Sequence, residues 1–172
     1  MTGDDDAFIE ALRSSGPDPE LADRLGLFGQ FVGSWVLEVT NYDADGGGVT
    51  LSGEWHFGWV LGGRAVADIW ICPSRSATDQ TPYEHGMSVR FYDESIEAWR
   101  STWIGPVRRI VRPFTARPIG AEIVLEGRIE GGLETRWVFS DITPTSFLWR
   151  NEESIDGPSW RLNQTFVARR AG

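Results

Sequence analysis

Two carboxylates inside apolar, strand-like runs are the side chains of this sequence that could transfer protons. Asp68 and Glu153 each lie among alternating hydrophobic residues. An apolar interior raises the pKa of a carboxyl group toward neutrality, which suits general acid–base catalysis. The competing interpretation is that Glu153, beside Glu152, is a solvated charge that pairs with Arg150 or Arg100. Both interpretations remain open at the level of sequence.

Tryptophan is the second notable residue type, with nine in 172 residues, nearly all of them in short alternating runs. Each indole has a wide apolar face and one N–H donor that needs a partner when it is buried. Many tryptophans on strands therefore indicate either a lined cavity or an aromatic-rich core. One tryptophan alone is more often core than ligand contact, so their number on one face of a sheet is the useful signal.

The other reactive residue types are scarce, and we predict neither a metal nor a cofactor. Cys72 is the only cysteine, which excludes an internal disulfide and a cysteine-based metal cluster. His56 and His85 have no carboxylate spaced to complete a zinc site. All sixteen basic residues are arginine, so a Schiff-base enzyme, which needs a lysine, is excluded. The sequence contains no phosphate-binding glycine loop and no nucleophile-elbow motif.

Charge and hydropathy restrict the class of partner. The net charge of −9 disfavours a nucleic acid, whose phosphates need clustered cations. The only basic cluster of note contains Arg108, Arg109 and Arg112. No apolar run reaches the length that spans a bilayer, so no membrane is expected. The acidic start, residues 1–6, differs from a secretory signal, and we expect a cytoplasmic protein.

Helical signals occur only in the first part of the chain. Acidic residues precede a short helix predicted over residues 7–12. A second helix is predicted over residues 19–27, with Asp18 as its N-cap. We expect this lead-in, residues 1–30, to pack on a domain formed by residues 31–172.

From Ser34 onward, hydrophobic residues alternate and turn residues recur about every ten positions, which is typical of an all-β protein. The pattern predicts ten strands over residues 34–42, 49–61, 64–72, 84–92, 96–104, 107–115, 121–129, 133–142, 146–155 and 159–168. Connections this short favour an antiparallel meander. Closing the meander removes both exposed edges, so we predict an up-and-down β-barrel wide enough for a small ligand.

A resemblance to a known family agrees with this fold class. Gly33-Ser34-Trp35 opens the first strand after a helical lead-in. The other stretches that carry the resemblance are residues 53–61, 63–70, 90–93 and 99–100. In these features the chain resembles the calycin superfamily and, within it, the lipocalin-like bacterial proteins of the DUF1579 type. The resemblance covers residues 31–172 and implies a lipocalin-like barrel, and most such proteins have no assigned activity.

The resemblance also implies which side chains face the lumen, because lipocalin-like barrels turn the tryptophan of the first strand inward. Alternation then extends this choice along the other strands. The side chains predicted to face the lumen are Trp35, Leu37, Val39, Trp55, Phe57, Trp59, Met87, Val89, Phe91, Trp99, Ser101, Trp103, Trp137, Phe139, Phe147, Trp149, Asn151, Glu153, Trp160, Leu162, Gln164 and Phe166. Few of these are polar, and those few are candidates to orient a ligand.

The strand predicted over residues 64–72 does not alternate cleanly. If the helices cover the barrel here, its small alanines face the helices and Asp68 enters the lumen together with Trp70. The opposite orientation leaves Asp68 on a solvent-exposed face. The sequence does not choose between the two.

Three functions are compatible with these observations. The first is binding of a small hydrophobic or aromatic molecule in a tryptophan-lined lumen, with contacts from Trp35, Trp55, Trp70, Trp99, Trp103, Trp149, Asn151, Trp160 and Gln164. The second is a cofactor-free cyclase or isomerase of a bacterial biosynthetic pathway, since some lipocalin-like barrels close rings by confining substrates. Its catalytic residues would be Asp68 and Glu153. The third is a solid barrel that acts as an interaction module, with a homodimer as one form.

Overall fold

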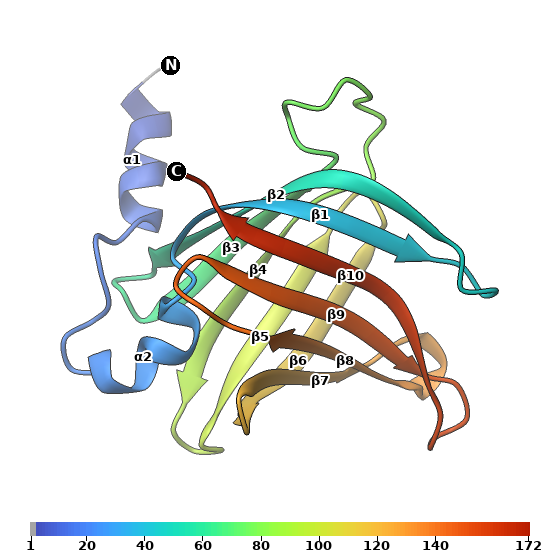
Figure 1. Cartoon of the computed structure of the whole chain (residues 1–172). Helices are drawn as coiled ribbons and strands as arrows, with labels where there is room; N and C mark the ends of the chain where they lie inside the picture. Colours follow the sequence, from blue (N-terminus) through green and yellow to red (C-terminus); the bar gives the residue numbers. More distant parts are fainter. Residues whose placement is uncertain (1–2) are drawn as a thin grey trace.

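The computed structural model describes residues 3–172, so the first two residues of the predicted lead-in lie outside the described part. Ten strands form the body of the molecule, with both helices toward one side (Figure 1). The elements are α1 (Gly3–Leu12), α2 (Ala22–Gly29), β1 (Gly33–Tyr42), β2 (Gly48–Val60), β3 (Ala65–Cys72), β4 (Glu84–Asp93), β5 (Ala98–Gly105), β6 (Ile110–Ile119), β7 (Glu122–Arg128), the 3-10 turn η1 (Glu130–Gly132), β8 (Glu134–Ser140), β9 (Ser146–Ser154) and β10 (Trp160–Arg170).

The strands close into a barrel in which each strand pairs antiparallel with its neighbours in sequence and β1 pairs with β10. Trp35 of β1 lies opposite both Trp55 of β2 and Arg170 of β10. Closure leaves no free edge strand in the sheet. The prediction of an all-β, ten-stranded, antiparallel up-and-down barrel is confirmed.

Of the strands that begin later than predicted, β5 and β6 differ most, because the preceding turns are longer. β5 begins at Ala98 and β6 at Ile110. The last turn residue before β5 is Glu97, with φ 48°, and the one before β6 is Arg109, with φ 59°. Both residues adopt the left-handed conformation, which ends the turn before the strand can start.

The second helix begins at Ala22 and not at residue 19, so Asp18 is not its N-cap. The Asp18 carboxylate instead accepts a hydrogen bond from the Glu20 N–H (2.9 Å) and forms an ion pair with Arg64 (2.7 Å). These contacts hold residues 18–21 in a turn, and helix α2 starts after it without a side-chain cap. The ion pair with Arg64, which is distant in sequence, explains why the local capping pattern wrongly predicted Asp18 as the N-cap.

The two helices have different roles. α2 closes one end of the barrel, where Leu25 and Phe28 are fully buried (Figure 1). α1 lies outside, and Leu12 packs against Val60, Ala65 and Ala67. Backbone hydrogen bonds link the segment after α1 to the end of β2, including Ser14 N–H to the Trp59 carbonyl (2.9 Å).

The position of α1 decides the orientation of β3. Its alanines face the helix, as the first alternative required, and Asp68 and Trp70 therefore point into the lumen. Asp68 lies opposite Phe57 of β2, which is also buried inside the barrel.

The predicted orientation of β4 is wrong. Met87 and Val89 pack with the outer cluster beneath α1, and Phe91 is exposed. The lumen side of β4 instead carries Glu84, Gly86, Ser88 and Arg90. Alternation distinguishes the two faces of a strand but does not tell which face is inside. On β4 the outer face is apolar because it packs on the cluster that Leu12 of α1 joins. The inner face is polar because Ser88 lies opposite Asp68.

The predicted orientation of the start of β10 is also wrong. The pairing of β10 with β9 shifts between Leu162 and Gln164, so Asn163 is an extra residue in the strand. Before this bulge, Trp160 and Leu162 point outward, whereas Gln164 and Phe166 after it point inward as predicted. A β-bulge inverts the alternation along a strand, and the hydrophobic pattern alone does not reveal it.

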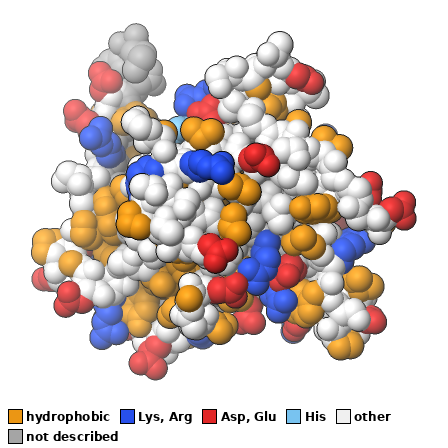
Figure 2. Space-filling view, in the orientation of Figure 1, with side chains coloured by type: hydrophobic (Ala, Val, Ile, Leu, Met, Phe, Trp, Pro, Cys, Tyr) orange, Lys and Arg blue, Asp and Glu red, His pale blue; other side chains and the backbone are white. Residues whose placement is uncertain are grey.

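On the part of the outer surface that Figure 2 shows, charged side chains of both signs are interspersed with hydrophobic ones. On this surface Arg150 binds Glu122 (3.0 Å) and Glu152 (3.4 Å), and Arg136 also binds Glu152 (2.5 Å). These strand arginines therefore stabilise the outside of the sheet and do not reach the lumen.

Candidate functional site: a tryptophan-lined cavity

The barrel interior has a packed half and an open half. In the packed half, Phe28 of α2 contacts Trp99 edge-on at 5.0 Å and Phe139 at 6.0 Å between ring centroids. The other aromatic side chains of this half are Phe31, Trp35, Phe57 and Phe147. The interior beneath α2 is therefore solid.

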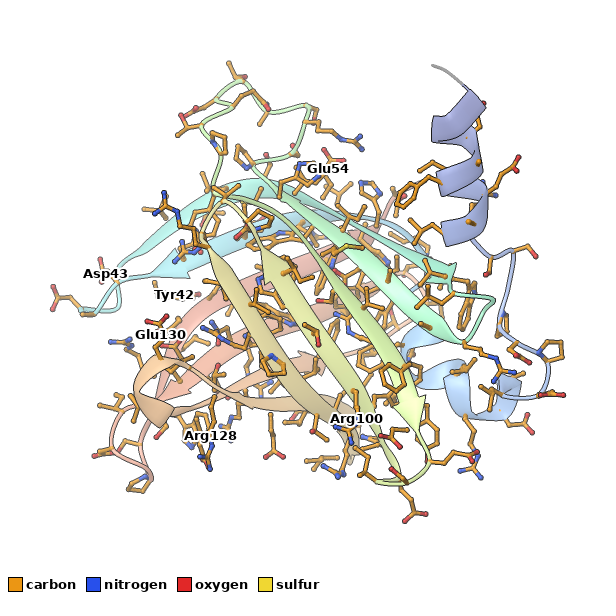
Figure 3. The ribbon with its side chains drawn as sticks, turned by 180° about the vertical axis from the view of Figure 1, so that it is seen from behind. Tyr42, Asp43, Glu54, Arg100, Arg128 and Glu130 are labelled. Carbon is orange, nitrogen blue, oxygen red and sulfur yellow. The ribbon has the colours of Figure 1, made fainter. Side chains whose placement is uncertain are left out.

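A cavity of about 350 Å³ occupies the other half, at the end of the barrel away from α2. Its lining comes from Asn41, Tyr42, Trp55, Trp70, Tyr83, Glu84, Ser88, Trp103, Arg108, Ile110, Arg112, Trp137, Trp149, Asn151, Glu153, Arg161, Asn163, Gln164 and Phe166. Figure 3 marks this end by Tyr42 at the end of β1 and Glu130 in η1. The mouth is formed by the ends of strands far apart in sequence.

Five tryptophans supply most of the apolar wall: Trp55, Trp70, Trp103, Trp137 and Trp149. Trp149 stacks on Phe166 at 4.2 Å, and Trp70 lies 5.0 Å from the same ring. Gly86 makes room for this wall, because a Cβ there would meet the Trp103 ring at 2.5 Å. The cavity therefore offers flat aromatic surfaces on several sides.

Several indole N–H groups in this wall have no acceptor. Within residues 3–172, the Nε1 atoms of Trp55, Trp70, Trp137 and Trp149 are buried and donate no hydrogen bond to the protein. A buried donor without an acceptor costs free energy. By contrast, Trp35 in the packed half donates to the Phe31 carbonyl at 2.7 Å.

The predicted amide residues lie at the cavity and are held in place. Gln164 donates from Nε2 to the Asn41 Oδ1 (2.5 Å) and to the Tyr83 hydroxyl (3.4 Å). Asn151 accepts a hydrogen bond from the Thr135 hydroxyl at 3.1 Å. Each amide therefore has a set orientation and remaining hydrogen-bonding capacity at the cavity wall.

Glu84 is a buried carboxylate of the cavity that sequence reasoning missed. It is 1% exposed and accepts backbone N–H groups of His85 (3.0 Å), Val107 (3.2 Å) and Arg108 (3.4 Å). These donors stabilise its negative charge and attach the turn after β5 to the start of β4. Glu84 reaches the cavity because β4 turns this face inward. Gly86 and Ser88 on the same face are small or polar, and they were the sequence signal for this orientation.

Three arginines line the mouth. Arg161 lies 3.7 Å from Glu153, and Arg108 lies over the Tyr83 ring at 4.6 Å. Arg112 is partly buried, and this burial is the main cause that lowers the pKa of its guanidinium. The signal for this site was present in the sequence as the basic cluster 108–112, but only the barrel register places two of its members at the cavity.

The predicted catalytic carboxylates do not form a pair. Asp68 is 1% exposed and forms an ion pair with Arg90, outside the set of cavity-lining residues. Glu153 does line the cavity, at its mouth, where its nearest basic partner is Arg161. Asp68 on β3 thus pairs with Arg90 on β4, and Glu153 on β9 pairs with Arg161 on β10.

The tryptophans predicted as ligand contacts fall into three places. Trp55, Trp70, Trp103 and Trp149 line the cavity. Trp35 and Trp99 are buried in the packed half, and Trp160 lies outside the lumen, with Arg136 4.2 Å above its ring. Trp137, which was predicted to face the lumen without being named a contact, joins the lining.

Other candidate chemistry lies elsewhere or is not assembled. His56 is on the outer face, bonded through Nδ1 to the Ser34 hydroxyl (2.8 Å) and through Nε2 to Glu54 (2.9 Å). Over the described residues, His, Cys, Asp and Glu side chains do not gather in groups of three or more that could hold a metal ion. None of the helices in residues 3–172 has the length and hydropathy needed to cross a membrane.

Comparison with solved structures finds similar barrels at low sequence identity. The S-type phycobiliprotein lyase CPES from Guillardia theta superposes with a TM-score of 0.58 and 13% identity, covering 86% of this chain and 92% of that one. Rv2717c from M. tuberculosis gives 0.57 and 12%, covering 91% and 99%. These likenesses concern the fold alone, a closed antiparallel barrel. No protein-family model and no curated protein matches the sequence.

Proposed function

We propose that this protein binds one small hydrophobic or aromatic molecule in the tryptophan-lined half of its barrel. The observation that carries the proposal is the cavity of about 350 Å³ with five tryptophans in its wall. Ligand sites in proteins are concave, mostly apolar and about 300–1,000 Å³ in volume. A molecule bound here would contact aromatic faces and the fixed amides of Asn151 and Gln164.

The contrast between the two halves of the lumen supports binding over an interaction role. Aromatic side chains pack closely beneath α2, so the same residue types could have filled the other half. The indole donors of Trp55, Trp70, Trp137 and Trp149 remain without a protein acceptor around the cavity. A ligand with acceptor atoms would offset that cost.

We also propose a family group for this protein. Membership of the DUF1579-type group is supported by residues 33–35 and the accompanying strand stretches. One neighbour in fold is named a phycobiliprotein lyase. In this chain Asp68 forms an ion pair with Arg90, and Glu153 forms one with Arg161.

Titration with N-phenyl-1-naphthylamine, a neutral aromatic dye, tests the proposal. Because five tryptophans line the cavity, bound dye will quench their emission in a saturable way with one site per chain. Ile110→Trp fills the cavity wall and should weaken binding at least about tenfold. Ile119→Trp, at the exposed far end of the same strand β6, is the matched control and should bind as the wild type does.

Two results would contradict the proposal. The first is the lack of any saturable signal with the dye. The second is unchanged dye affinity in the Ile110→Trp variant, because the dye would then occupy another part of the molecule.

A further inference from the structure

We infer that the cavity mouth is an anion subsite, formed by Arg112 with Arg108, and that the ligand is therefore a small aromatic acid. Its ring system would lie against the tryptophans and its carboxylate or similar anionic group at the mouth. This inference rests on the proposed function and names the class of molecule that the same cavity takes.

The charged side chains around the cavity leave an excess of positive charge at its mouth. Three arginines and two glutamates line the cavity of a chain whose net charge is −9. Three backbone N–H groups stabilise the Glu84 carboxylate, and Glu153 lies 3.7 Å from Arg161. Arg108 and Arg112 thus remain as cations at the mouth of the cavity.

Arg112 is positioned on the inner face of the barrel. It pairs with Trp103, which faces the lumen, so Arg112 faces the lumen from β6. A row of paired positions crosses the four strands β3 to β6 here, formed by Asp68, Ser88, Trp103 and Arg112. The guanidinium therefore lies beside the aromatic wall and not on the outer surface of the barrel.

Arg112 is half-buried, and its burial is not compensated by direct contact with a carboxylate. Over residues 3–172, its guanidinium has neither an ion pair nor a hydrogen bond, although Glu153 and Glu130 attract it from a distance. Burial and the neighbouring positive charge of Arg108 both lower its pKa. Removing a cation from water without a partner is costly, and an anion bound beside it would offset that cost.

Arginine also has the geometry that an acid needs. Its planar guanidinium can donate two parallel hydrogen bonds to a carboxylate, and such charge-assisted bonds are stronger than neutral ones. Arg108 is positioned by its contact with the Tyr83 ring and by the attachment of its turn to Glu84. The two guanidinium groups therefore approach the mouth from a turn and a strand that the fold holds in place.

Two dyes that differ in one group test the inference. 8-Anilinonaphthalene-1-sulfonate has the ring systems of N-phenyl-1-naphthylamine and adds an anionic sulfonate. In the wild type, we expect the anionic dye to bind about ten- to a hundredfold more tightly than the neutral one. This is the gain in affinity that hydrogen bonds to a charged group typically provide. Arg112→Met should remove most of this difference and leave the neutral dye within about twofold.

Matched controls separate a local effect from net charge and from folding. Arg169→Met makes the same charge change on the exposed face of β10 and should keep the preference for the anionic dye. Glu153→Gln removes the carboxylate that attracts Arg112, and should raise the affinity for the anionic dye. Circular dichroism and thermal melting of each variant verify the fold, and the Glu153→Gln result decides if Arg112→Met does not fold.

The outcomes are distinguishable from those of the proposed function. Equal affinities for the two dyes in the wild type would overturn the anion subsite and leave the cavity as a binding site. A preference for the anionic dye that survives in Arg112→Met, or no gain in Glu153→Gln, would also overturn it. Failure of both dyes to bind the wild type would overturn the proposed function together with this inference.

Discussion

Asp68 and Arg90 form an ion pair inside the barrel, and the Arg90 guanidinium also lies 4.9 Å from the ring centroid of Phe28 in α2. The two residues belong to adjacent strands, β3 and β4, and both are 1% exposed. The Asp68 carboxylate additionally accepts the Ser88 N–H at 3.4 Å. This pair therefore joins the barrel wall to the helix that closes one end.

Arg90→Met should destabilise the protein strongly, because it leaves the Asp68 carboxylate buried without its partner. Breaking a buried ion pair from one side costs about 3–5 kcal/mol, whereas replacing both partners with apolar groups is often neutral. The double variant Asp68→Leu/Arg90→Met should therefore recover most of the loss. Urea unfolding of the wild type and the variants measures this, and a single-variant cost under about 1 kcal/mol would argue that the pair is solvated.

Phe28→Ala tests the division of the lumen into two halves. Phe28 is fully buried against Trp99 and Phe139, so its truncation should lower the free energy of unfolding by about 3–5 kcal/mol. Because Phe28 does not line the cavity, the affinity for N-phenyl-1-naphthylamine should stay within about twofold of the wild type. A large loss of dye affinity in a folded variant would mean that the packed half also takes part in binding.

Glu54 makes stability depend on acid pH. Hydrogen bonds from Arg75 are the main cause that lowers the pKa of Glu54 from 4.5 to about 2, and His56 adds to this (Figure 3). A lowered pKa contributes stability that is present above the unfolded value of 4.5 and is lost as the pH falls toward about 2. The difference in melting temperature between wild type and Glu54→Gln should therefore shrink as the pH falls through this window. A difference in melting temperature that stays the same across this pH range would show that Arg75 does not lower the pKa of Glu54 in the folded protein.

Cys72 should be unreactive until the protein unfolds. Its side chain is 1% exposed, and burial raises the pKa of the thiol to about 11. Since the thiolate is the nucleophile, a disulfide reagent at mildly alkaline pH should react with the native protein only at the rate of unfolding. In denaturing urea the reaction should be complete on mixing, and equally fast reaction of the native protein would contradict the buried position.

The strand meander was predictable from sequence because it depends on local signals, namely alternation and short polar turns. The orientation of two strands was not. On β4, the apolar residues Met87 and Val89 pack on an outer cluster that Leu12 of α1 also joins, and no local pattern indicates this packing. On β10, the bulge at Asn163 reverses the alternation, so Trp160 lies outside although it fits the apolar pattern.

The candidate site was predictable only in its aromatic part. Trp55, Trp70, Trp103 and Trp149 were identified because large side chains on one strand face mark the lumen. Which of the tryptophans line the cavity depends on α2, whose Phe28 packs against Trp99 in the other half. Arg112 was visible only as part of a basic cluster, since its place beside Trp103 follows from the register of β5 with β6.

Because α2 and its aromatic neighbours fill one end of the lumen, a molecule that enters at the opposite mouth must leave by the same route. It would enter with its rings leading and its acidic group trailing toward solvent. Extensions of the ligand would then be tolerated at the acidic end and rejected at the ring end. The exchange rate would depend on the turns around the mouth, including the long connection between β3 and β4, and would be insensitive to substitutions within α2.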